Sequence, residues 1–193
     1  MAGQAMASEI MSMAAEAAGD AAVDLVEIAV RDHTRLVYKI AYSVLRNTAD
    51  AEDAIQETFL RVLRQRKGLS EVEDVKNWVA RIAWRVAVGR RKRSREVPLD
   101  EANENIEQVR MISESADEVA ITAQSINLLH RLIAGLPGDL RDPLLLSTVQ
   151  EMSPSDIAHV LGTSPAAVRA RLFRARGVLR EKMFALMEGK HGK

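Results

Sequence analysis

Residues 153–179 read SPSDIAHVLGTSPAAVRARLFRARGVL, a stretch that holds two helix starts and one helix stop in close succession. The dipeptide Ser153-Pro154, with Asp156 three residues after the serine, is a helix start of the capping-box type. Gly162 ends that helix, and Ser164-Pro165 begins the next one. The stretch therefore predicts a helix, a tight turn and a second helix, which is the helix-turn-helix arrangement.

The second of these helices has an apolar side and a basic side. At about 100° per residue, one stripe collects Val168, Leu172, Ala175 and Leu179. The opposite side holds Ala166, Ala167, Ala170 and Arg174, with Arg169, Arg171 and Arg176 on its flanks. Small side chains let a helix enter a major groove, where long arginines reach phosphates and guanine edges. The pattern favours DNA binding over the alternative, a solvated basic helix that pairs with an acidic segment of the chain.

Helical spacing continues through the rest of the chain, and no period-two alternation typical of strands is present. Helices are predicted over about residues 22–45, 51–65 and 75–91. Residues 94–120 contain Pro98 and many acids with weak periodicity, which is typical of a linker with at most fragmentary helix. The sequence therefore predicts an all-α protein, in which two small helical domains are joined by an acidic linker and the second contains the helix-turn-helix.

Charge is segregated along the 193 residues, although 27 basic and 27 acidic side chains cancel. Residues 23–93 and 121–193 each carry a net positive charge, whereas residues 1–22 and 94–120 are acidic. Two basic blocks around an acidic one suggest two modules that face nucleic acid. Charge alone is equally consistent with three solvated surfaces.

Several classes of function are excluded by what the sequence lacks. Without cysteine, there are no disulfides, thiolate metal sites or cysteine nucleophiles. No apolar run approaches the ~20 residues that span a bilayer, and residues 1–22 lack the basic start of a signal peptide. The four histidines are scattered and no phosphate-binding glycine loop occurs. We expect a soluble, cytoplasmic protein that is not an enzyme and that needs no cofactor or metal.

The first predicted domain offers two further surfaces. On residues 51–65, an acidic and apolar face suggests a protein partner, although a solvated face is the commoner explanation. On the third predicted helix, the core stripe is accompanied by basic side chains, and residues 81–93 carry six of them without one acid: Arg81, Arg85, Arg90, Arg91, Lys92 and Arg93. Trp84 falls across the helix from the core stripe, where an exposed indole could stack on an unpaired base. The alternative is that a linker or partner covers this side chain.

Three motifs in this order carry a family resemblance. They are DAEDAIQETFLRV at residues 50–62, NWVARIA at residues 77–83, and Leu136-Pro137 followed by residues 152–176. This sequence resembles the extracytoplasmic-function sigma factors of bacterial RNA polymerase over about residues 23–93 and 121–185. The resemblance implies that residues 23–93 form sigma region 2, which binds core polymerase and the minus-ten element. It implies that residues 121–193 form sigma region 4, which binds the minus-35 element, with the acidic linker at 94–120 between the two regions. Residues 1–22 match nothing in the family and are expected to form a flexible N-terminal extension.

The resemblance also assigns roles to individual residues. The clamp of core polymerase would contact Asp53, Gln56, Glu57 and Leu60. The minus-ten element would be bound by Lys67, Asn77, Arg81, Trp84, Arg85 and Arg91, within or after a loop that captures a flipped base. The minus-35 element would be bound by Ser164, Ala166, Arg169, Arg171, Arg174 and Arg176.

Some positions depart from the family pattern. Arg85 and Gly89 occupy positions where the family commonly has an Asn and an Asp, and Trp84 occupies a position where the family usually has a basic residue. Pro143 falls inside a predicted helix, so a kink or a late helix start is expected there.

The expected partners are core RNA polymerase, promoter DNA and an anti-sigma factor, with no small-molecule substrate and no membrane insertion. Two alternatives stay open at this point. One is a sigma-like interaction module that sequesters an anti-sigma factor without touching DNA, and the other is a stand-alone helix-turn-helix regulator. Arginines retained in the recognition helix argue against the first, and a need for the first domain would argue against the second.

Overall fold

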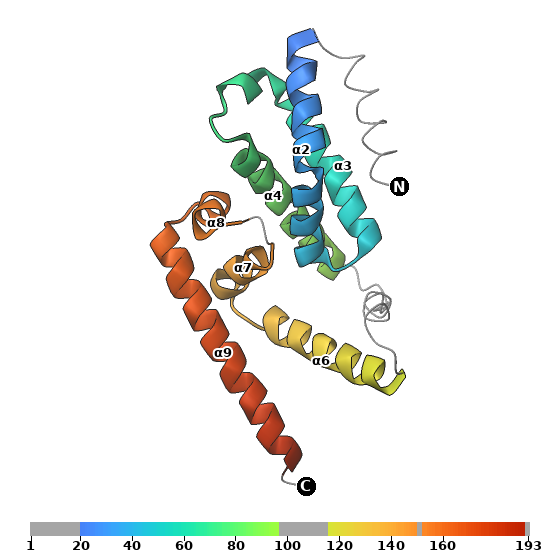
Figure 1. Cartoon of the computed structure of the whole chain (residues 1–193), viewed down its shortest axis with the longest axis vertical. Coiled ribbons are helices and arrows are strands. Elements are labelled where there is room, and N and C mark those ends of the chain that lie inside the picture. Colours follow the sequence, from blue (N-terminus) through green and yellow to red (C-terminus); the bar gives the residue numbers. More distant parts are fainter. Residues whose placement is uncertain (1–19, 97–115, 150–151, 192–193) are drawn as a thin grey trace.

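A computed structural model describes residues 20–96, 116–149 and 152–191, and these residues form helices with no strand among them (Figure 1). The predictions for an extension and a linker therefore fall largely outside the described residues. At their edges, helix extends further than expected, because α4 continues to Glu96 and α6 begins at Ala116. No helix in the described ranges is both long and apolar enough to cross a membrane.

The first body of the fold consists of α2 (Asp20–Leu45), α3 (Thr48–Arg64), the 3-10 turn η1 (Arg66–Glu71) and α4 (Val75–Glu96). Asn47 caps α3, since its side-chain oxygen accepts a hydrogen bond from the Asp50 backbone N–H at 2.9 Å. The three long helices pack against one another around a core that includes Ile40, Phe59 and Val79, which are fully buried. Burying the apolar stripes of amphipathic helices is what makes this body stable.

The second body consists of α6 (Ala116–Ala134), α7 (Gly138–Ser147), α8 (Pro154–Leu161) and α9 (Pro165–His191). Helix α7 begins directly after Pro137 and continues through the buried Pro143, so the late helix start expected from that proline is wrong. The core of this body is centred on Leu146, Ile157 and Val168, which come from three different helices.

The two bodies contact each other, which the sequence did not predict. Helix α8 lies against α4, and α7 lies against the end of α2 (Figure 1). We call this contact the junction. It is held by side chains of α4 on one side and by α7 and α8 on the other.

Candidate nucleic-acid interface

The helix-turn-helix is built as its caps predict. The Ser153 hydroxyl accepts from the Asp156 backbone N–H at 3.2 Å, and the Asp156 carboxylate accepts from the Ser153 N–H at 2.7 Å. Gly162 adopts φ +65°, the left-handed conformation that glycine reaches without strain. The Ala158 carbonyl then accepts from the Thr163 N–H at 3.0 Å, which closes the turn. The capping box and the glycine stop are confirmed.

Replacing Ser153 by alanine should lower the stability of this body by about 1 kcal/mol, because one N-cap hydrogen bond is lost. Thermal unfolding of the full chain followed by circular dichroism measures the effect. Ser155→Ala is the matched control. Ser155 is an exposed serine two residues after Ser153, in the first turn of α8, and it makes no capping hydrogen bond among the described contacts. Equal effects of the two changes would show that the capping box does not hold α8.

The basic face of α9 is open to solvent. Val168, Leu172, Ala175 and Leu179 are buried, which confirms the predicted core stripe. On the other side, the exposed or partly exposed residues are Ser164, Ala166, Arg169, Arg171, Arg174 and Arg176. The Ser164 hydroxyl accepts from the Ala167 N–H at 3.1 Å, so this serine caps α9. The structure therefore brings all six residues assigned to duplex DNA onto one helix, with their side chains outside the core.

One residue on this face was missed by sequence reasoning. Phe173 is 81% exposed, the most exposed of the large apolar side chains described as exposed. With Arg169, Arg176 and Arg180 it lines a hollow of about 540 Å³. Its position about 100° from Arg174, away from the core stripe, is the signal that would have found it. The basic face of α9 therefore also carries one exposed aromatic ring.

On the face of α3 assigned to a protein partner, some residues are open to solvent and others form hydrogen bonds with arginines of α3 and α4. Asp53 and Gln56 are exposed, and Leu60 is partly exposed. The Glu57 carboxylate, however, accepts from Arg61 Nη2 at 2.6 Å and from Arg90 Nε at 3.0 Å. Arg90 Nη1 also donates to Asp53 at 3.1 Å. Glu57 therefore joins α3 to α4, in addition to any contact it makes outside the chain.

The pKa of the Glu57 carboxyl follows from these contacts. Partial burial raises it, but hydrogen bonds from Arg90 and Arg61, together with their charges, outweigh that effect and leave the pKa below its ordinary value. The carboxylate is thus held ionised between two guanidinium groups. This makes Gln56, which is exposed and has no such bridging role, the cleaner position for testing the surface.

The residues assigned to minus-ten DNA are divided by the structure. Arg85 is exposed, and Lys67 lies in η1 with its side chain outside the described part of the molecule. The other four lie four, three and seven residues apart, which are whole turns of a helix, and so they share one side of α4. They are Asn77, Arg81, Trp84 and Arg91. That side faces the junction rather than solvent, as its contacts show.

Of the two alternatives left open for Trp84, the structure shows the covered side chain rather than the exposed one. Its side chain is only 6% exposed and belongs to the hydrophobic core. The reason is that the side of α4 opposite its first core stripe is covered by the second body. Periodicity within one helix identifies both apolar sides of such a helix but does not reveal a second body that packs on it.

The junction is polar at its α8 end. Asn77 Nδ2 donates to Asp156 Oδ1 at 3.0 Å, and Lys76 Nζ lies 3.4 Å from Asp156 Oδ2. Arg81 donates through Nε to the His159 carbonyl oxygen at 3.0 Å, and its Nη2 donates to the same oxygen. The carboxylate that caps α8 therefore also anchors that helix to α4.

Asn77 is buried and Asp156 is partly buried at this end of the junction. Partial burial raises the pKa of the Asp156 carboxyl, but hydrogen bonds from Ser153 and Asn77 and the Lys76 charge outweigh it, so the pKa lies below its ordinary value. Asn77 also donates to Asp74 at 2.7 Å, which uses both amide hydrogens on carboxylates. Its Oδ1 is buried without a hydrogen-bond partner. Such an atom typically costs about 1–3 kcal/mol.

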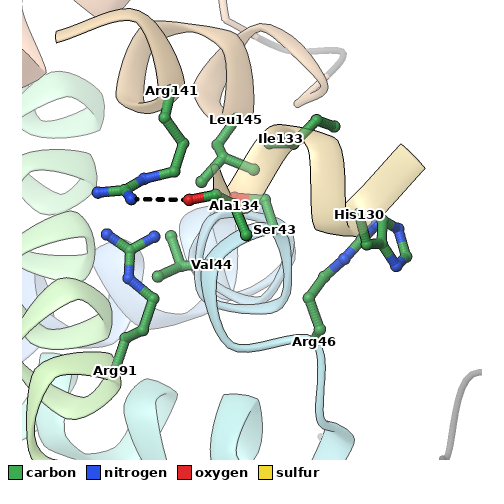
Figure 2. A pocket seen from close by; sticks show the side chains of 9 residues that line it. All are labelled: Ser43, Val44, Arg46, Arg91, His130, Ile133, Ala134, Arg141 and Leu145. Atoms are coloured by element: carbon green, nitrogen blue, oxygen red, sulfur yellow. Dashed lines mark hydrogen bonds between the residues drawn. The ribbon is translucent and has the colours of Figure 1, made fainter. Parts of the chain in front are cut away.

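At its other end the junction is loosely packed and basic. A cavity of about 100 Å³ lies between the bodies, and Figure 2 shows the nine residues that line it: Ser43, Val44, Arg46, Arg91, His130, Ile133, Ala134, Arg141 and Leu145. This space leaves the two bodies incompletely packed at this end. Asp142 is the acid that pairs with Arg91, at 3.9 Å, and with Arg141, at 3.4 Å.

The cations around this cavity affect one another. Arg46 and His130 lie side by side on one wall, and the guanidinium groups of Arg91 and Arg141 lie near each other on the opposite wall (Figure 2). Burial lowers the pKa of the Arg46 guanidinium, and burial together with the Arg46 charge lowers the pKa of the His130 imidazole. The packing of the two bodies thus brings Arg46 and His130 together on one wall, while on the opposite wall Asp142 pairs with Arg91 and Arg141.

Comparison with known proteins gives matches to both bodies. The family description Sigma-70 region 2 matches residues 29–96, and Sigma-70, region 4 matches residues 126–179. The ferric citrate uptake sigma factor FecI of Escherichia coli is 32% identical over 135 residues, which cover 68% of this chain and 75% of FecI. The ECF RNA polymerase sigma factor SigE of Mycolicibacterium smegmatis is 28% identical over 167 residues, 86% of this chain and 65% of SigE.

A solved structure supports the fold. CnrH in complex with the cytosolic domain of CnrY matches with a TM-score of 0.52 and 22% identity, covering 91% of this chain and 96% of that one. The match spans both helical bodies.

Proposed function

The chain belongs to the extracytoplasmic-function sigma factors of bacterial RNA polymerase, and from this premise we propose that it directs core polymerase to specific promoters and helps open them at the minus-ten element. The observation that carries the proposal is that both sigma regions occur in order, with the arginines of a capped helix-turn-helix turned outward. Sigma factors are initiation factors, so the chemistry belongs to the polymerase.

We assign residues 23–93 to region 2 and residues 121–193 to region 4, with an extension at 1–22 and a linker at 94–120. In the helical bodies, region 2 comprises α2 to α4 and region 4 comprises α6 to α9. Region 4 would read the minus-35 duplex, with Arg174 over the base edges and Arg169, Arg171 and Arg176 on the flanking phosphates. The support is the exposure of these side chains on the side of α9 away from its core.

Region 2 would hold the melted minus-ten strand with the basic end of α4 and the preceding loop. Asn77, Arg81, Arg85 and Arg91 supply donors for phosphates and base edges. Extruding a base costs a few kcal/mol, which a pocket in the loop between α3 and α4 must offset. Trp84 is left out of this set because its ring is buried.

Core polymerase would dock on the α3 face formed by Asp53, Gln56, Glu57 and Leu60. Replacing Gln56 by lysine should weaken core binding by about tenfold or more, because a charge is buried in the interface without a partner. Fluorescence titration of labelled chain with purified core measures this affinity. Gln65→Lys is the control, since it makes the same change at an exposed residue just past the end of α3. Unchanged affinity in Gln56→Lys would remove this face from the interface.

Action on polymerase places the protein in the cytoplasm, and we propose an anti-sigma factor as its inhibitory partner. CnrH, of the same fold, is known in complex with the cytosolic domain of CnrY.

The decisive experiment is run-off transcription with purified core on fragments of the source genome. The proposal predicts new transcripts from a limited set of start sites when the chain is added. Binding of DNA operators without polymerase, and no new transcript, would favour a stand-alone regulator instead.

A further inference from the structure

We propose that the cavity at the junction is a binding site for a small organic acid, whose carboxylate pairs with Arg46 and whose apolar body fills the space between α2, α6 and α7. The proposal goes beyond promoter recognition and does not depend on it. It rests on the backbone at Arg46, on the charges around the cavity and on the apolar lining of that cavity, all of which belong to the described residues.

The first argument is the backbone conformation of Arg46. This residue directly follows α2, which ends at Leu45, and its N–H donates to the Tyr42 carbonyl oxygen at 3.0 Å. Its φ is +60°, and within the described ranges no other residue except a glycine has a positive φ. Helices commonly place glycine at this position, because a side chain there costs backbone strain. A strained arginine in place of glycine indicates that its side chain is needed.

The second argument is the charge of Arg46. Its guanidinium is partly buried and lies 5.9 Å from the centre of the Tyr42 ring, and burial lowers its pKa. In the described part of the chain, no carboxylate acts on this group to offset that burial. The His130 imidazole lies beside it (Figure 2), and burial and the Arg46 charge lower the pKa of that group as well. A bound carboxylate would compensate the Arg46 charge through charge-assisted hydrogen bonds.

The two walls of the cavity differ in how their charges are balanced. On the α4 and α7 wall, Asp142 pairs with Arg91 at 3.9 Å and with Arg141 at 3.4 Å, so these arginines have a counter-charge within the chain. The wall with Arg46 and His130 has no acid among the described residues that line the cavity. The carboxylate of a ligand is therefore assigned to the Arg46 wall.

The third argument is the size and lining of the cavity. Its other lining residues include the apolar side chains of Val44, Ile133, Ala134 and Leu145. Ligand sites commonly combine such apolar walls with a few polar groups that fix the orientation of the ligand. The volume is about 100 Å³, whereas a cavity that accepts benzene has about 150 Å³. A short branched carboxylate such as isovalerate fits this space and this charge, and a nucleotide is too large for it.

The test is a titration of the full chain with isovalerate, followed through the imidazole signals in NMR spectra. The chain has four histidines, and the variant His130→Gln identifies the signal of His130. Isovalerate should shift this signal in a saturable way, with a dissociation constant of about 1 mM, the range expected for so small a ligand. Isovaleramide, which has the same shape without the charge, should bind about tenfold more weakly or less. The same is expected of sulfate, which has charge but no apolar body.

Variants at Arg46 separate its charge from its place in the fold. Arg46→Met keeps an apolar stem and removes the charge, so isovalerate should bind about tenfold more weakly or less, whereas Arg46→Lys should keep part of the affinity. Arg64→Met is the matched control, since it removes an exposed arginine at the end of α3 and should leave the affinity unchanged. Circular dichroism of each variant reports whether it is folded.

Arg46→Gly tests the argument from the backbone. Glycine adopts a φ of +60° without strain, so this variant should unfold at a temperature about 2–4 °C above that of the wild type while it loses isovalerate binding. A lower unfolding temperature would show that the arginine stabilises the fold, which would overturn the proposal.

The titration of the wild-type chain decides the proposal even where a variant fails to fold. A saturable shift of the His130 signal with isovalerate, and a much weaker one with isovaleramide, would support the site. No saturable shift, equal binding of the amide, or equal affinity of a folded Arg46→Met variant would overturn it. Equal binding of sulfate would overturn the assigned ligand class, which is an acid with an apolar body.

Discussion

Changing Arg174 to glutamate is expected to weaken binding of minus-35 duplex DNA by about 100-fold. A well-placed arginine on a guanine edge contributes ~1–3 kcal/mol, and 1.4 kcal/mol corresponds to a tenfold change in affinity. The glutamate also brings a negative charge to the phosphates. Arg174 is exposed on the side of α9 away from the core, so the change should not affect folding. Fluorescence anisotropy with promoter duplexes at fixed salt measures the effect.

Lys182→Glu is the matched control for this prediction. It makes the same charge reversal on an exposed site of α9 two turns further along the helix. A small loss is expected there, from long-range electrostatics alone. If both variants lost affinity equally, Arg174 would act only through net charge, and its role in reading bases would be rejected.

Trp84→Ala should lower the stability of the chain by about 3–5 kcal/mol, the usual cost of deleting a large buried aromatic side chain. The ring is 6% exposed and belongs to the core. The size of the effect distinguishes a buried indole from an exposed one. Removing an exposed indole would change the free energy of unfolding by less than about 0.5 kcal/mol. Urea unfolding of the full chain, followed by circular dichroism, gives the free energy.

Phe173→Ala provides the comparison for Trp84→Ala. Phe173 is 81% exposed, so deleting its ring should leave the unfolding midpoint within error of the wild type. Equal stability of the two variants and the wild type would mean that Trp84 lies in solvent. The burial of Trp84 would then be rejected.

Much of each helical body could be predicted from local signals. The apolar stripe of α9 and the caps at Ser153 and Gly162 depend on residues close in sequence, so periodicity and capping chemistry were sufficient. The outward side of the recognition helix followed directly, because the core stripe fixes what is left for solvent.

The rest depends on contacts between residues far apart in sequence. Nothing local at Asp156 reveals that its capping carboxylate also accepts from Asn77, 79 positions earlier. The same holds for Glu57, whose neighbour Arg90 lies on another helix. A periodic pattern on α4 therefore identified which residues share a side but not what covers that side. For Trp84 it left an exposed and a covered side chain open, because the second body is invisible to such a pattern.

The central claim is that region 2 binds the minus-ten element and region 4 binds the minus-35 element. Footprinting of the holoenzyme on one of its promoters tests it most directly. Protection across both the minus-ten and minus-35 elements is expected with wild-type chain, and Arg174→Glu should lose the upstream part while keeping core bound. A footprint that disappears evenly from both elements, or that never differs from core polymerase alone, would contradict the account.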